Sequence, residues 1–189
     1  MALSTRDTII AAADRYIREM GYNAFSYKDI SDSVGIKTAS IHYHFPAKSD
    51  LGVATIRYHI AQFGITRQEL ASRPPLVRLR WFLDNYCRIN ADNKVCMVGA
   101  LATAFNTLEE PIQQELRIYA AEILEWVTEI LTEGQKDGIF HFEMAPRTRA
   151  LMVIGNMLAI VQLARLTGSE DVRRVQHAII KELTTKPTI

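Results

Sequence analysis

Hydrogen-bonding side chains cluster in the short segment between residues 37 and 44. The cluster consists of Lys37, Thr38, Ser40, His42, Tyr43 and His44. A helix that only faces solvent more often carries glutamate, lysine and glutamine. Hydroxyl, imidazole and phenol groups can instead reach base edges, thymine methyl groups and phosphates. The chemistry that suits this segment is therefore the recognition of double-stranded DNA.

Further polar residues stand where two helices are predicted to begin. Ser26, Tyr27 and Lys28 open one helix and Lys48 opens another. The N-terminus of a helix offers backbone N–H groups and the positive end of its dipole to phosphate oxygens. The formal net charge is only +1, so any contact with DNA must come from such a local patch.

The elements that must position these residues form a predicted helix-turn-helix. Apolar residues at helical spacing predict a first helix over residues 4–20. Ser26 with Asp29 opens a second, short helix, Gly35 suits the tight turn that follows, and a third helix covers residues 38–45. A helix of about two turns is marginal alone, so it must pack on the first helix.

Across these residues the chain resembles the TetR family of regulators. Gly35 and Ile36, followed by residues 41–51, are similar to the family's signature across its recognition helix and fourth helix. The resemblance implies a repressor that binds a palindromic operator as a homodimer and releases it when a small molecule occupies the C-terminal domain.

The resemblance also implies roles for individual residues. Base and backbone contacts would fall to Thr38, Ser40, Tyr43 and His44, and a phosphate contact to Lys48. Two positions depart from the family's pattern. Lys37 stands where a small capping residue is frequent, which leaves the cap to Thr38 or to nothing, and His42 stands where tyrosine is frequent.

The remaining chain predicts an all-α fold of nine helices in two domains. Six further helices are expected, over residues 48–71, 76–90, 95–108, 111–138, 147–166 and 170–184. Residues 1–47 form the predicted helix-turn-helix DNA-binding domain. Residues 48–189 form the ligand-sensing and dimerisation domain, and the helix over residues 48–71 bridges the two.

Aromatic and sulfur-containing side chains after residue 76 are the materials of an effector pocket between helices, and equally those of an ordinary core. They suit an apolar or aromatic small molecule. The candidate lining residues are Trp81, Tyr86, Cys96, Met97, Leu101, Phe105, Tyr119 and Trp126.

Cysteine usage predicts reduced thiols. Cys87 and Cys96 form no C-x-x-C pair, which argues against a disulfide scaffold or a zinc site. Cys96 follows Lys94 at a predicted helix start, where a thiol pKa is lowered. An alternative function is therefore a redox- or electrophile-sensing regulator that acts through Cys96.

The segment 151–161 is apolar on nearly every side, which predicts that a second copy of the chain covers part of it. The deepest core helix of a monomer is the alternative. A second apolar stripe on the last helix suggests a four-helix interface. The predicted interface residues are Leu151, Ile154, Leu158, Val161, Val172, Val175, Ile179 and Leu183.

Other classes of protein find little support in the sequence. It contains no catalytic motif and no cofactor fingerprint, so we expect no enzyme activity, no cofactor and no metal. His42 and His44, two residues apart on a helix, do not converge on one ion.

We also expect no signal peptide or membrane span, and hence a cytoplasmic protein. A helical protein-interaction module without DNA binding, and activation in place of repression, remain alternatives.

Overall fold

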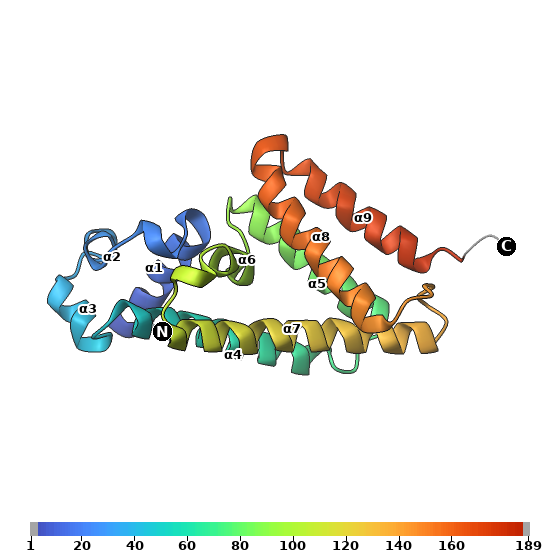
Figure 1. Cartoon of the computed structure of the whole chain (residues 1–189), viewed down its shortest axis with the longest axis horizontal. Coiled ribbons are helices and arrows are strands. Elements are labelled where there is room, and N and C mark those ends of the chain that lie inside the picture. The colour runs from blue at the N-terminus through green and yellow to red at the C-terminus, as the bar shows by residue number, and fades with distance from the viewer. Residues whose placement is uncertain (1–3, 187–189) are drawn as a thin grey trace. The chain divides into compact units, whose positions relative to one another are not determined.

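The computed structural model describes residues 4–186, and within them every regular element is helical (Figure 1). The all-α prediction of nine helices is confirmed for these residues, with two short 3₁₀ helices in addition. The elements are α1 (Thr5–Met20), η1 (Tyr22–Ala24), α2 (Tyr27–Val34), α3 (Thr38–His44), α4 (Lys48–Leu70), α5 (Pro75–Ala91), α6 (Met97–Ala102), η2 (Phe105–Thr107), α7 (Glu110–Lys136), α8 (Pro146–Thr167) and α9 (Glu170–Thr184).

The chain folds into two compact units. The first contains the chain up to Thr66 together with Cys96–Tyr119, and the second contains Arg67–Val95 and the chain from Ala120 onward. The long helices α4 and α7 each contribute residues to both units. This division differs from the predicted boundary between residues 47 and 48, because α6 packs on α1. The functional division at that boundary stays a prediction.

The stretch from residue 95 to residue 108 does not form one continuous helix. Instead α6 ends at Ala102 and η2 follows. The side-chain amide of Gln113, in α7, donates hydrogen bonds to the carbonyls of Phe105 and Leu108, at 3.0 and 2.9 Å. These bonds satisfy carbonyl groups that a continuous helix would have used, and they stabilise the break.

In the second unit α8 and α9 lie side by side and antiparallel, and both pack on α5 (Figure 1). Four of the predicted interface residues belong to this packing and are buried within the single chain, so they cannot line an exposed surface. They are Val161, Val172, Ile179 and Leu183.

Helix α9 begins without a side-chain cap. Ser169 occupies the N-cap position, but its side chain makes no capping hydrogen bond.

Helix α8 is unusually apolar. Among residues 4–186 it alone is long and apolar enough, by length and composition, to cross a membrane, and the core helix of a soluble protein can pass the same test. One face of α8 is covered by α5 and α9, with Ala150, Val153 and Met157 buried. Its opposite face is exposed.

A substitution at Gly134 tests how tightly the end of α7 packs. A Cβ atom at this position would overlap the buried ring of Phe140. We expect Gly134→Ala to lower the free energy of unfolding by about 1–3 kcal/mol through overpacking. Gly64→Ala is the matched control, because a Cβ there meets no atom within 4 Å. It should raise that free energy by about 0.5–1 kcal/mol. Urea unfolding measures both, and equal effects would contradict the packing described here.

Candidate nucleic-acid interface

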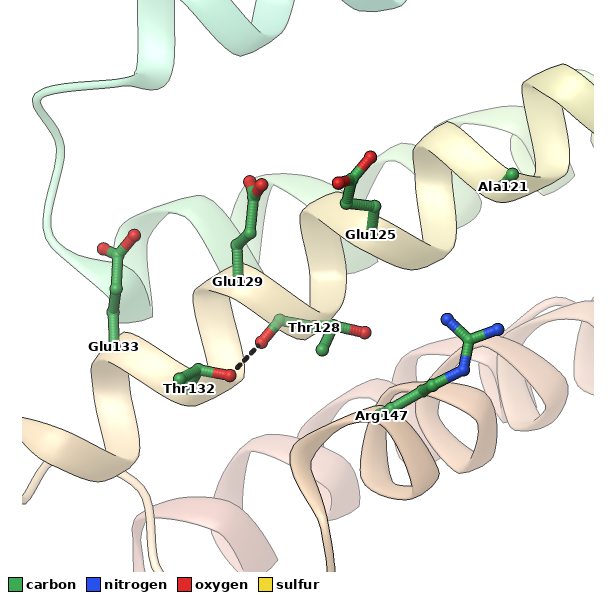
Figure 2. Close-up of a pocket in the computed structure, with 7 residues that line it drawn as sticks. All are labelled: Ala121, Glu125, Thr128, Glu129, Thr132, Glu133 and Arg147. Carbon is green, nitrogen blue, oxygen red and sulfur yellow. Dashed lines mark hydrogen bonds between the residues drawn. The ribbon is translucent and has the colours of Figure 1, made fainter.

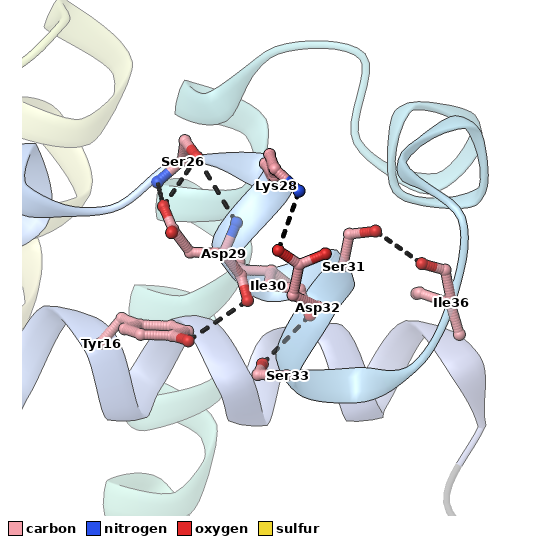
Figure 3. A network of polar contacts seen from close by, with 9 residues as sticks. All are labelled: Tyr16, Ser26, Lys28, Asp29, Ile30, Ser31, Asp32, Ser33 and Ile36. Atoms are coloured by element: carbon pink, nitrogen blue, oxygen red, sulfur yellow. Dashed lines mark hydrogen bonds and ion pairs between the residues drawn. The ribbon is translucent and has the colours of Figure 1, made fainter.

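Helix α2 is fixed at its start by a reciprocal cap (Figure 3). The Asp29 carboxylate accepts a hydrogen bond from the Ser26 backbone N–H at 2.7 Å, and the Ser26 hydroxyl accepts one from the Asp29 N–H. The bond with the Ser26 side chain, followed by that with its backbone, lowers the pKa of Asp29. The Tyr16 hydroxyl donates to the Asp29 carbonyl at 3.2 Å and ties α2 to α1. The predicted pairing of Ser26 with Asp29 is confirmed.

The turn between α2 and α3 is held by one glycine and one serine. Gly35 adopts a left-handed conformation with φ of 74°, which costs glycine little. The Ser31 hydroxyl donates to the Ile36 carbonyl at 2.6 Å across the turn (Figure 3). Lys37 then occupies the N-cap of α3 and makes no side-chain capping bond. The sequence left the cap of α3 to Thr38 or to no residue, and the structure shows no side-chain cap.

Helix α3 buries one side and exposes the other. Ile41 is completely buried, while Tyr43 is 83% exposed. Lys37 and His42 are also exposed. The remaining cluster members are half-buried, namely Thr38, Ser40 and His44. The structure thus brings the polar cluster together on one short helix, with Tyr43 projecting furthest.

Two of the predicted DNA contacts turn inward instead. The Tyr27 hydroxyl donates to the carbonyls of Phe45 and Ala47, at 2.9 and 2.6 Å. Burial, and then the charge of Asp50, raise the pKa of Tyr27 to about 12, so the hydroxyl stays protonated. Tyr27 thereby fixes the link between α3 and α4, and its contact with DNA stays a prediction.

Lys48 is the second residue that turns inward. Its ammonium donates to the Tyr22 carbonyl at 2.6 Å and to the Phe25 carbonyl. It also lies 4.6 and 4.1 Å from the ring centroids of Tyr22 and Phe25. Burial lowers the pKa of Lys48. An ammonium has three donors, so a phosphate contact would use the remaining one, and that contact stays a prediction.

Two exposed cations belong to the same unit as this cluster. Lys28 pairs with Asp32 at 3.0 Å, but both side chains are mostly exposed, so the pair is weak (Figure 3). The sequence analysis missed Arg6, whose guanidinium lies 5.3 Å from the ring centroid of Phe45. Arg6 and His44 line a cleft of about 730 Å³ beside the end of α3. Periodicity could not indicate this placement, because Arg6 precedes the cluster by more than thirty residues.

The candidate effector residues are divided between the two units. Three belong to the second unit, where Trp81 and Trp126 meet edge to face at 6.1 Å and Tyr86 is buried. The other five belong to the first unit, and they are Cys96, Met97, Leu101, Phe105 and Tyr119. Met97 and Leu101 are core residues there. The pocket predicted from these eight residues stays a prediction.

A groove in the second unit lies elsewhere. It has a volume of about 520 Å³ and runs along α7, with Arg147 of α8 on its other side (Figure 2). Apart from Ala121 its lining residues are polar, and none was among the predicted pocket residues. Glu129 pairs with Arg67 at 3.5 Å and Glu133 pairs with Arg78, so part of its acidic charge is compensated.

The two cysteines have different surroundings. The Cys96 sulfur caps α6 by accepting a hydrogen bond from the Gly99 N–H at 3.2 Å. The Cys87 thiol donates to the Gln176 side-chain oxygen at 3.3 Å, and burial raises its pKa. A raised pKa makes Cys87 a poor nucleophile. Sensing through Cys96 stays a prediction.

Among the residues that the structure describes, no group of three or more His, Cys, Asp or Glu side chains is placed to hold a metal ion.

Two protein-family models match this chain, one in its N-terminal part and one in its C-terminal part. The family model described as "Bacterial regulatory proteins, tetR family" matches residues 9–55. The model described as "Tetracyclin repressor-like, C-terminal domain" matches residues 75–179. The transcriptional regulator CymR of Pseudomonas putida is 34% identical over 79 residues, which are 42% of this chain and 36% of that protein. The match therefore spans little more than a third of that relative's length.

Two solved structures are similar over nearly the whole chain. A TetR transcriptional regulator from Legionella pneumophila is 33% identical, with a TM-score of 0.87, and the match covers 97% of this chain and 100% of that one. A TetR-family regulator from Agrobacterium tumefaciens is 30% identical, with a TM-score of 0.87, and covers 95% and 97%.

An acid-sensitive contact fastens α1 to α4 beneath the interface. The Asp14 carboxylate lies 2.6 Å from Nε2 of His59 and 3.2 Å from Arg18. Burial raises the pKa of Asp14, but the hydrogen bond and charge of His59, together with Arg18, outweigh burial and lower it below 3.8. The ionised form therefore contributes stability at pH values above its ordinary pKa, and this contribution is lost as the pH falls through the lowered value.

Asp14→Asn tests this contact. We expect it to reduce the free energy of unfolding by about 2 kcal/mol near pH 5, with the difference from the original chain shrinking toward pH 3. Asp32→Asn, which removes a mostly exposed ion pair, should change that free energy by less than about 0.5 kcal/mol. A difference for Asp14→Asn that stays constant over this pH range would contradict the assignment.

Proposed function

Because this chain belongs to the TetR family of DNA-binding transcriptional regulators, we propose that it holds a palindromic operator as a homodimer in the cytoplasm and releases it when a small-molecule effector binds. The family is a class of regulators of the repressor type and not of enzymes. The absence of catalytic activity in this chain stays a prediction.

One observation carries the proposal for the reading surface. The exposed side of α3 carries Tyr43, His42 and Lys37, while its other side is anchored by the fully buried Ile41. A short helix with a buried apolar side and an exposed polar side suits insertion into the major groove of DNA. Lys28 and Arg6 lie at helix starts, where they suit contacts with flanking phosphates.

The exposed face of α8 supports a homodimer. Its exposed large side chains are Leu151, Met152, Leu163 and Leu166. Gly155 and Ala159 continue the same face at four-residue spacing, and small residues permit close approach of a second helix. A homodimer would carry two copies of α3, one for each half-site of a palindrome. We therefore assign the interface to this face of α8, in place of the four buried residues expected from the sequence.

Release by an effector would act through α4. The ammonium of Lys48, at the start of α4, donates to the Tyr22 carbonyl in η1 and to the Phe25 carbonyl that follows it, and Asp14 of α1 contacts His59 of α4. A displacement of α4 would therefore move the elements that carry α3. The predicted effector remains an apolar or aromatic small molecule, which suits the cluster of Trp81, Phe82 and Trp126.

Selection of bound sequences from a random DNA pool tests the proposed function. The full chain should enrich a palindrome, and its affinity for that palindrome should fall steeply with salt. If no sequence is enriched, the helical interaction module without DNA binding becomes the better description.

The salt dependence of operator binding identifies the phosphate contacts. Lys28→Ala should lower the affinity for the selected operator and reduce the slope of log affinity against log salt by about one, because one phosphate contact is lost. Lys136→Ala, at the end of α7, is the matched control and should leave both quantities unchanged. An unchanged slope for Lys28→Ala would show that Lys28 contacts no phosphate.

A charge on the exposed face of α8 tests the interface. Leu163 is 50% exposed, so Leu163→Glu should fold normally but give a monomer by sedimentation. Its affinity for the palindrome should fall by about a hundredfold or more, because two half-sites are no longer bound together. Met20→Glu, at a similarly exposed position on α1, should remain a dimer. A dimeric Leu163→Glu would place the interface elsewhere.

A further inference from the structure

His42 is exposed, yet its ring is held at two points. Nδ1 lies 3.3 Å from the carbonyl oxygen of Pro46. The ring also meets Tyr27 edge to face, with 4.8 Å between the centroids and an interplanar angle of 67°. His42 is therefore more constrained than a solvated histidine on a helix surface would be.

The partner that holds the ring is itself fixed. Tyr27 donates its hydroxyl proton to the carbonyls of Phe45 and Ala47, and its pKa is raised to about 12. The backbone after α3 thus positions Tyr27, and Tyr27 together with Pro46 positions the imidazole. The edge of the ring that carries Nδ1 is occupied by this contact.

The contact with Pro46 determines which nitrogen carries the proton. A carbonyl oxygen has no proton to donate, so Nδ1 must be the donor. In neutral imidazole one nitrogen donates and the other accepts, so the neutral ring has a lone pair at Nε2, whereas a protonated ring would donate from both nitrogens. A tyrosine at this position would instead offer a hydroxyl proton. In its neutral form the His42 ring therefore offers an acceptor at Nε2 where tyrosine would offer a donor.

We propose that His42 is a specificity-determining residue, whose Nε2 accepts a hydrogen bond from an exocyclic amino group in the major groove. This inference rests on the proposed function, because it requires that α3 lies in that groove. Cytosine N4 and adenine N6 are the amino groups exposed there, whereas guanine and thymine present only acceptors and a methyl group. His42 thus selects cytosine or adenine at one position of each half-site.

The neutral form of the His42 ring does not suit a phosphate contact. Phosphate oxygens in DNA accept hydrogen bonds and carry no proton, so the lone pair of Nε2 has nothing to receive from them. A base edge that carries an amino group is the complementary partner.

A base-analogue cycle tests the inference on the operator recovered by selection. At each cytosine or adenine of the half-site, the base is replaced by 2-pyrimidinone or purine, which lack the exocyclic amino group. Affinity is measured for the original chain and for His42→Phe, which keeps a ring against Tyr27 but has no nitrogen. Weaker base pairing in the modified DNA affects both proteins alike, so the cycle isolates the contact.

We expect one position at which removal of the amino group lowers the affinity of the original chain about fivefold, the factor that a single hydrogen bond contributes. His42→Phe should show no such loss at that position. His42→Gln, which again offers an acceptor oxygen, should restore part of it. The measurements with the original chain alone still show whether removal of one amino group lowers the affinity, even if a variant folds poorly.

Three results would overturn the inference. One is a loss that is equal in the original chain and His42→Phe at every position. Another is a His42-dependent position occupied by guanine or thymine. The third is a uniform loss of affinity in His42→Phe with a reduced salt slope, which would indicate a phosphate contact. A chain that enriches no sequence at all would instead overturn the proposed function, so the two failures are distinguishable.

Discussion

The candidate interface depends on the apolar packing beneath a helix of seven residues. A helix this short does not persist alone in water, so its position must come from its neighbours. Ile41 of α3, Ile30 of α2 and Ile9 of α1 are all completely buried, and each such side chain contributes about 1.5–3 kcal/mol. Because α3 packs on α1 and α2 with Ile41 buried, its exposed polar side chains are displayed on the other side.

A second layer of contacts converts this packing into a defined surface. Tyr27 and Lys48 belong to helix starts that sequence patterns associate with DNA, yet their polar groups bind backbone carbonyls inside the unit. Their contribution is to hold the links that lead into α2 and out of α3. The side chains left at the surface, Tyr43 and His42 above all, then face solvent from a backbone with little freedom to move.

Local rules made much of this structure predictable, and contacts between different elements made the rest unpredictable. The cap formed by Ser26 and Asp29, and the turn at Gly35, follow from neighbouring residues alone. The break after α6 depends on Gln113, whose partner Phe105 lies eight residues away. Periodicity also showed that α8 is apolar all round, but it could not show that Val161 faces the chain's own core while Leu163 faces outward.

Side-chain footprinting with hydroxyl radicals, with and without the selected operator, tests the central claim most directly. Tyr43 is 83% exposed and Met20 is 58% exposed, and both belong to the first unit. If the exposed side of α3 reads DNA, Tyr43 should lose its reactivity when the operator is saturating, while Met20 keeps its own. An unchanged reactivity of Tyr43 on a bound operator would contradict the assignment of α3 as the reading helix.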